Sequence, residues 1–213
     1  MVTEAKILTA IPSKAPNLPI APVEYSQQFQ DQFSNVLRLY FNQLDNFTGA
    51  IATTGGGSNL QLPNGAWYDT TTQTRAAINT AQAVTFNSNT LQNQITKNTV
   101  DTSKIYVDVA GYYNFQFSAQ ISKASGGASY VWIWPRVDGL DITASASKVA
   151  VQGATAESVP AWNFVLPMQA GSYFQLMWAT DSDVKLLAEA ATAFAPSIPS
   201  VILTATFVSA LYT

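Results

Sequence analysis

Residues 109–121 read Val109-Ala110-Gly111-Tyr112-Tyr113-Asn114-Phe115-Gln116-Phe117-Ser118-Ala119-Gln120-Ile121. From Tyr113 onward, apolar residues alternate with Asn, Gln and Ser, which is the period-two pattern of a strand with one buried and one hydrated face. Upstream, Ile105, Val107 and Val109 keep the same parity, and Gly111 interrupts it. This stretch therefore predicts a mainly β fold.

The rest of the second half of the chain continues the pattern of short strands. Apolar segments at 130–134, 162–166, 173–178 and 201–208 are separated by turn signals, namely Ser125-Gly126-Gly127, Asp138-Gly139, Gly153, Ala170-Gly171 and Asp181-Ser182-Asp183. Strands at this spacing, without alternating helices, predict a sandwich or jelly roll. The segments 130–134 and 173–178 are apolar on both faces. Because only one face of a sandwich strand lies in the core, we expect another subunit to cover the second.

A helix is predicted ahead of this β region, over about 24–47, with Gly49 as its stop. Apolar residues recur there at steps of three and four: Tyr25, Phe29, Phe33, Val36, Leu37, Tyr40, Phe41, Leu44 and Phe47. The region 24–52 is thus interpreted as an amphipathic helix for oligomerisation or docking. The Gly-rich segment 53–59 predicts a hinge, which leaves 60–213 as a β head.

The first 23 residues form a separate region. Prolines at 12, 16, 19 and 22 exclude a helix or a central strand and favour an extended conformation. A disordered tail is one interpretation; we favour an arm that orders against another subunit or protein, because the segment is too apolar for a solvated tail. The candidate anchoring residues are Ile7, Ile11, Leu18, Ile20 and Val23.

Composition narrows the function. Among 213 residues only 11% are charged while 47% are hydrophobic, which favours burial between subunits over a charged free surface. The chain has no His and no Cys, so thiol and imidazole chemistry is excluded, and we expect no enzyme, cofactor or metal. The ten basic residues are scattered, so we expect no nucleic acid. No apolar run is long enough to span a bilayer, and the first residues lack a secretory pattern, so a soluble protein is expected.

Few residues suggest site chemistry. The pairs Asp138 with Asp141 and Asp181 with Asp183 could ligate Ca²⁺, but such residues more often form hydrogen bonds within turns, and neither pair supplies enough ligands. The spacing of the carboxylates singles out no catalytic pair. Arg136 is expected to pair with a carboxylate, in the chain or across an interface.

Of the five tryptophans, four lie in strand patterns, where core or interface packing is expected. Trp67-Tyr68 is the freer candidate for a surface contact.

Residues 109–115 resemble the G-x-Y-x-F strand of the complement C1q/tumour-necrosis-factor-like jelly roll. Residues 83–87 resemble an earlier strand, 166–176 the turn before a late strand, and 200–208 the closing strand. Ser172 stands where the family usually has Asp. The resemblance spans 66–208 and implies a ten-stranded domain that forms tight homotrimers with aromatic contacts around the threefold axis.

The segments 18–25 and 37–44 resemble the leading part of structural proteins from marine and cyanobacterial phages. This implies a virion protein, a trimeric fibre or capsid decoration component whose N-terminal region contacts other virion proteins. The predicted oligomer interface comprises Phe29, Phe33, Val36, Tyr40, Leu44, Trp132, Trp134 and Tyr173. The alternative function is a receptor-binding protein that recognises a host surface glycan; a hydrolase is a second alternative, against which the absence of His argues. The position on the particle stays open.

Overall fold

The computed structural model describes residues 16–20, 22–52, 62–124 and 126–211. The chain divides into two compact units, Met1–Gln61 and Leu62–Thr213. The predicted hinge at 53–59 lies outside the described residues, as do the anchoring candidates Ile7 and Ile11.

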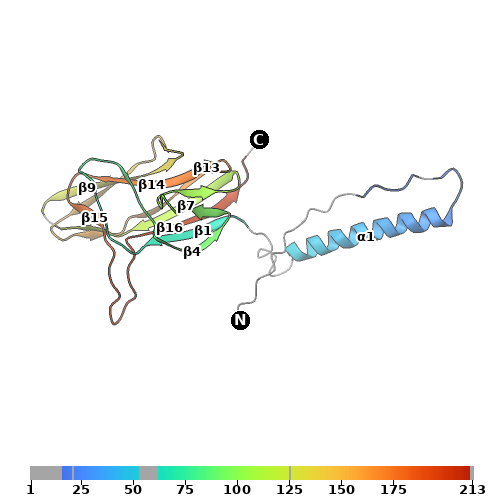
Figure 1. The fold of residues 1–213 in the computed structure, drawn as a ribbon, viewed down its shortest axis with the longest axis horizontal. Helices are drawn as coiled ribbons and strands as arrows, with labels where there is room; N and C mark the ends of the chain where they lie inside the picture. The colour runs from blue at the N-terminus through green and yellow to red at the C-terminus, as the bar shows by residue number, and fades with distance from the viewer. Residues whose placement is uncertain (1–15, 21, 53–61, 125, 212–213) are drawn as a thin grey trace. The chain divides into compact units, whose positions relative to one another are not determined.

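Helix α1 spans Gln27–Ala52 (Figure 1). It starts three residues later than predicted because Ser26 caps it: the Ser26 hydroxyl accepts a hydrogen bond from Phe29 N at 3.3 Å, and the Ser26 carbonyl accepts one from Gln30 N at 3.1 Å. The predicted stop at Gly49 is wrong, since the helix continues through it. Glycine costs a helix interior only about 1 kcal/mol, which neighbouring residues can offset.

The described residues of the second unit form sixteen strands, and the mainly β prediction is confirmed. The longer strands are β1 (Asn64–Asp69), β4 (Ser88–Asn93), β7 (Gly111–Ala119), β9 (Ala128–Val137), β11 (Ser147–Gln152), β13 (Ala161–Met168), β14 (Tyr173–Thr180) and β16 (Val201–Ser209). The shorter ones are β2 (Gln73–Thr74), β3 (Gln82–Ala83), β5 (Ile95–Lys97), β6 (Ile105–Val107), β8 (Ile121–Lys123), β10 (Leu140–Asp141), β12 (Glu157–Ser158) and β15 (Val184–Leu186).

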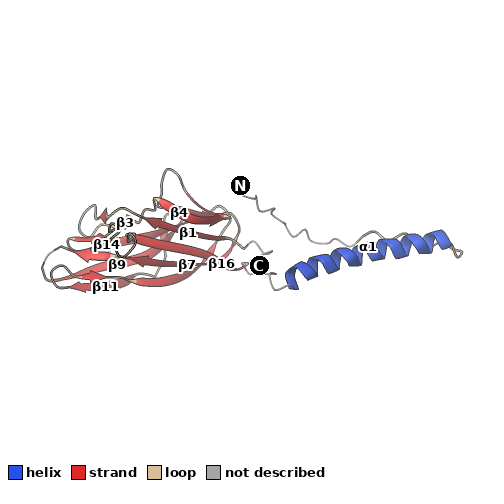
Figure 2. Ribbon diagram, turned by 90° about the horizontal axis from the view of Figure 1, so that it is seen from below, coloured by secondary structure: helices blue, strands red, loops and turns tan. Residues whose placement is uncertain are grey.

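Two antiparallel sheets form a jelly-roll sandwich (Figures 1 and 2). The first sheet has the order β13-β7-β16-β1-β4. The second has the order β10-β9-β14-β6-β5, with β11 also paired to β9 and β3 to β14. A small third sheet, β12-β8-β15-β2, includes β8 and β15, which directly follow β7 and β14 along the chain. Strands that are neighbours in space are mostly distant in sequence, as in a jelly roll.

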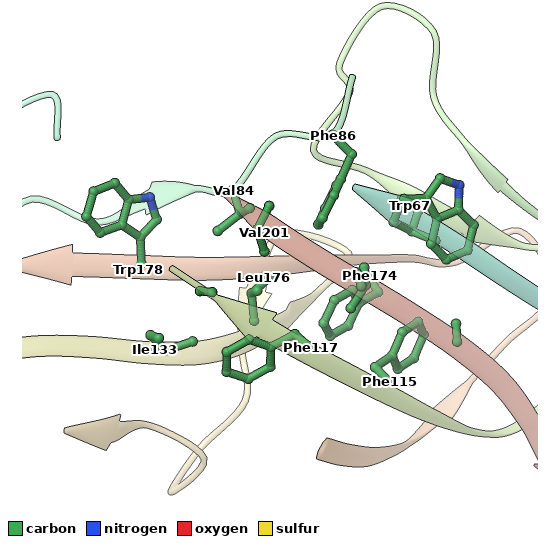
Figure 3. Packing of buried hydrophobic residues seen from close by; sticks show 14 of the residues in the cluster. Trp67, Val84, Phe86, Phe115, Phe117, Ile133, Phe174, Leu176, Trp178 and Val201 are labelled. Atoms are coloured by element: carbon green, nitrogen blue, oxygen red, sulfur yellow. The ribbon is translucent and has the colours of Figure 1, made fainter. Parts of the chain in front are cut away.

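The core lies between the two sheets and contains the alternating residues of β7 and β8. Tyr113, Phe115, Phe117 and Ile121 are at most 2% exposed, so the buried face predicted from the alternation is confirmed. Phe115 of the first sheet stacks on Phe174 of the second, with ring centroids 4.0 Å apart and planes at 5° (Figure 3). This contact joins the layers directly and fixes which side of each strand faces inward.

The turn predictions match the backbone. Gly126, Gly127, Gly139, Gly153 and Gly171 all have positive φ, a conformation that glycine adopts without strain. In the Asp138-Gly139 turn, Asp138 also enters the left-handed region. Its carboxylate accepts a hydrogen bond from Tyr173 N at 2.9 Å, and its backbone N–H donates to Tyr173 O at 3.0 Å. These bonds bring the β9–β10 hairpin against the start of β14.

The strand expected at 83–87 is largely absent, since only β3 remains of it. Val84 and Phe86 are nevertheless buried in the core. Val84 N donates to Leu176 O at 2.8 Å and Phe86 N to Thr102 O at 3.2 Å. The Gln73 side chain bonds the backbone N–H and C=O of Thr85 at 2.9 and 3.0 Å. The segment is therefore held by separate bonds to three different neighbours instead of by a continuous ladder.

Candidate functional site

In the part of the chain that the structure describes, the outer side of the first sheet carries no charged side chain. Its five strands, β13, β7, β16, β1 and β4, contain one charged residue, Asp69, and that residue is buried at the core side. The outward positions form what we call the neutral face: Leu91, Tyr68, Ala66, Asn114, Gln116, Tyr112, Ile202, Thr204, Thr206, Val208, Asn163 and Val165.

Apolar and amide side chains alternate over this neutral face. Val165, Ile202, Val208 and Leu91 are exposed. The Asn163 side-chain amide donates to Asn114 Oδ1 at 2.8 Å across β13 and β7. A surface of this kind has no charge to desolvate and can pack against an identical surface without like-charge repulsion.

The outer side of the second sheet is different, because it holds a shallow recess of about 570 Å³. We call it the tryptophan recess, and its lining residues are Asn79, Trp132, Trp134, Asp141, Ile142, Ala144, Ala146 and Ala179. Trp132 and Trp134 point outward from β9, since Val131 and Ile133, which alternate with them, belong to the core. Both indoles are half-buried.

Asp141 organises one side of this recess. Its Oδ1 accepts hydrogen bonds from Trp134 Nε1 at 2.8 Å and from Arg136 Nε at 2.7 Å. The Arg136 guanidinium, followed by the Trp134 indole N–H, lowers the pKa of Asp141 below its usual value. The carboxylate therefore stays ionised and holds the Trp134 ring in a defined orientation.

Two lysines stack on aromatic rings of the same sheet. Lys148 Nζ lies 3.6 Å from the Tyr130 ring centroid and 5.3 Å from that of Trp132. Lys104 Nζ lies 4.8 Å from the Tyr173 ring centroid. Both ammonium groups thus have aromatic partners within the chain.

The predicted need for a subunit to cover the second face of 173–178 is wrong in the middle of β14. Gln175 and Met177 point away from the core cluster, yet they are only 8% and 2% exposed. Gln175 Nε2 donates to Ser103 Oγ at 2.7 Å, so the turn before β6 covers this side within the chain. Tyr173 stays half-buried and pairs with Tyr106 at 5.4 Å between ring centroids.

The predicted interface residues of the helix lie along one stripe. Phe29, Phe33, Val36, Tyr40 and Leu44 are all half-buried, while their neighbours on the other side are exposed. Phe29 and Phe33 stack with ring centroids 6.1 Å apart. Whether this stripe meets other subunits, and whether Trp132, Trp134 and Tyr173 do, stays a prediction.

The described anchoring candidates Leu18, Ile20 and Val23 are exposed, the last two almost completely. They leave an apolar surface on the segment that precedes the helix. Their anchoring role stays a prediction.

The prediction that Trp67 makes a surface contact is wrong. Its side chain is 0% exposed, and its Nε1 donates to Gln92 Oε1 at 3.2 Å. The Asn64-Gly65 pair that precedes it has the composition of a turn, but both residues belong to β1. A Cβ on Gly65 would meet the Trp67 ring, so this glycine makes room for the indole in the core.

The aspartates of the acidic turns are engaged in hydrogen bonds and ion pairs within the chain. Asp181 Oδ1 accepts from Tyr130 N at 2.8 Å, and Asp183 lies 3.7 Å from an Arg75 nitrogen. Within the described residues, no three His, Cys, Asp or Glu side chains gather in a way that could hold a metal ion. In the same part of the chain, no helix has both the length and the apolar character to cross a membrane.

The tryptophan recess itself was not anticipated. Residues 130–134 were interpreted as interface packing, and Asp141 as part of a turn. The Arg136–Asp141 pair could have been predicted, because a hairpin closed by Asp138-Gly139 places these two residues opposite each other, as observed. What the sequence did not indicate is the contribution of Asn79 and Ala179, which come from distant parts of the chain.

No protein-family model matches the chain, and no curated protein matches it. Among solved structures, it is similar to the globular domain of the zebrafish complement 1qA protein, with 13% identity, a TM-score of 0.42, and coverage of 70% of this chain and 99% of that chain. We take neither a family nor a function from a likeness of this degree. The jelly roll described above stands on its own strand order.

Proposed function

We propose that this chain is a non-enzymatic structural protein that assembles as a homotrimer and serves as a fibre or decoration component of a phage particle. The observation that carries the assembly is the neutral face, a whole sheet surface without charge in which exposed apolar groups alternate with amides and hydroxyls. Interfaces between identical subunits have such a composition at their centre, where charged residues are depleted.

The helix stripe supplies the second element of the proposal. Five large apolar side chains at half burial call for a partner surface, and copies of the same helix provide one. The exposed apolar side chains Leu18, Ile20 and Val23 precede the helix and are suited to contact other virion proteins. The resemblance of this region to the leading segment of phage structural proteins supports the placement on a particle.

The proposed interface includes only part of the residues that the sequence predicts for it. The helix residues keep their interface role. Trp132, Trp134 and Tyr173 lie beside charged groups on the second sheet, and the tryptophan recess suits a small ligand better than a subunit.

The first test is the solution mass of the full-length chain by light scattering. We expect three times 22.9 kDa. Thr206→Asp places a carboxylate at the centre of the neutral face in every copy, and burying like charges together costs several kcal/mol, so it should release protomers. Thr96→Asp is the matched control, since Thr96 is exposed on the second sheet. A wild-type monomer, or a Thr206→Asp variant that stays trimeric, would refute assembly through this face.

The virion role needs a separate experiment. Antibodies against the recombinant chain should label purified particles of the phage that encodes it. Particles complemented with a chain that lacks residues 1–47 should lose the label although the head is produced. Particles that contain no copy of the chain would refute the virion assignment and leave the assembly untouched.

A further inference from the structure

Trp132 and Trp134 form a short apolar platform beside small residues. They are two positions apart on β9, so their attachment points lie about 6.6 Å apart on the same face. Ala179 is the register partner of Trp132 on β14, and Ala146, just before β11, also lines the recess. Methyl side chains at these positions leave the indoles accessible from above, where larger residues would cover them.

The rim of the recess supplies fixed hydrogen-bonding groups. Asp141 uses Oδ1 for Trp134 and Arg136, and within the described residues no hydrogen bond is found for Oδ2. The side-chain amide of Asn79 likewise has no partner in that part of the chain, although its backbone N–H donates to Thr180 O at 2.8 Å. One carboxylate oxygen and one amide thus remain for a ligand.

One residue that lines the recess has an unfavourable backbone conformation. Asn79 and Ala144 have φ of 55° and 59°. Asparagine tolerates this left-handed region, whereas alanine adopts it at a cost of about 1 kcal/mol or more, and such strain is found at ligand sites. For Ala144 no side-chain hydrogen bond can offset the cost.

The charges indicate what kind of ligand fits. Arg136 is neutralised by Asp141, and Lys148 lies on the Tyr130 and Trp132 rings. The Lys148 ammonium therefore disfavours a second cation over the indoles. At the rim, the outer oxygen of the ionised Asp141 carboxylate disfavours an anion. A neutral molecule with a flat apolar face and hydroxyl groups at its edge meets all of these conditions. A pyranose ring has this form.

We propose that the tryptophan recess binds a neutral sugar residue of a glycan, with the ring stacked on the indole of Trp132 and its hydroxyls bonded to Asp141 and Asn79. A volume of about 570 Å³ accommodates one to two such rings. The inference is independent of the assembly through the neutral face. It gives the alternative function, recognition of a host surface glycan, a defined site.

The test uses the full-length protein and ligand-observed saturation-transfer NMR. The probes are maltotriose, cellotriose, a trimer of N-acetylglucosamine and a trimer of galactose, with choline as the cationic comparison. At least one neutral sugar should bind saturably and choline should not. The absence of saturable binding by all four sugars, or binding of choline alone, would overturn the proposal.

Two variants locate the site. Trp132→Ala removes the platform, and Ala146→Phe fills the recess without removing any hydrogen-bonding group; each should weaken binding by about tenfold or more. Phe194→Ala, a change at a residue that is 92% exposed on a loop, should leave affinity unchanged. Unchanged affinity in both Trp132→Ala and Ala146→Phe would overturn the assignment.

Light scattering on the same samples separates the recess from a subunit contact. Trp132→Ala and Ala146→Phe should keep the wild-type mass and circular dichroism spectrum. Dissociation of either variant into folded protomers would show that this face meets another subunit, as first predicted, and would also overturn the sugar site.

Discussion

Truncation of Phe115 tests which side of β7 faces the core, and therefore which residues form the neutral face. The side chain is 0% exposed and its ring stacks on Phe174 with 4.0 Å between centroids. A buried phenyl ring removes roughly 150–200 Å² from water, which at about 25 cal/mol per Å² is about 4–5 kcal/mol. Phe115→Ala should therefore lower the free energy of unfolding by about 3–5 kcal/mol, a large part of the total for a domain of this size.

The assay is urea unfolding followed by tryptophan fluorescence at one fixed protein concentration, because assembly would otherwise contribute to the midpoint. Phe194→Ala is the matched control, the same chemical change at an exposed loop position, and should alter stability by less than about 0.5 kcal/mol. A loss below about 1.5 kcal/mol for Phe115→Ala, or equal losses for the two variants, would refute the register and with it the division into a neutral face and a core face.

Three further results are expected. Gly111→Ala should destabilise the head by about 1–3 kcal/mol in urea unfolding, since a Cβ there would lie 2.8 Å from Ser209 O and against a phenyl ring; an unchanged midpoint would contradict this packing. Gly49→Ala, with nothing within 4 Å of the added carbon, should instead raise helicity and stabilise α1 by about 0.5–1 kcal/mol, which a thermal melt at 222 nm would measure. Burial raises the pKa of Tyr113 to about 12, so the stability from its protonated form is complete below the unfolded pKa of about 10 and is lost as pH rises to about 12. Tyr113→Phe should flatten the fall in urea midpoint between about pH 10 and 12, and should cost about 1 kcal/mol at pH 7 through the lost hydrogen bond to Val109 O; an unchanged alkaline slope would exclude this cause.

The core strands were readable from sequence because their chemistry is local. In β7 the alternation of aromatic and amide residues specifies both the strand and its inward side, and glycine at 139 and 171 specifies the turns. The ends of the helix were less readable. A serine cap and a tolerated glycine both depend on hydrogen bonds and packing that differ by about 1 kcal/mol, which is within the range that neighbouring residues can override.

For strands that are apolar on both faces, the sequence did not predict which outward side chains are buried and which are exposed. Met177 is buried, whereas Trp132 and Trp134 are half-exposed, although all three lie in strands that are apolar on both faces. Which of them is covered depends on loops that are distant in sequence, such as the turn at Ser103 that meets Gln175. Periodicity cannot place such a loop, so the recess emerges only from the tertiary structure.

The distribution of charge over the sandwich gives its two sides different capacities. The strands of the first sheet hold one charged residue, and it faces inward, while the second sheet places Arg136, Asp141 and Lys148 around its exposed indoles. Covering this charged rim with a flat protein surface would cost part of its hydration, whereas a small polar ligand could leave the rim hydrated and use only the recess. The neutral face carries no charge to desolvate. The proposed self-association through the first sheet and the proposed ligand binding on the second would therefore not compete for one surface.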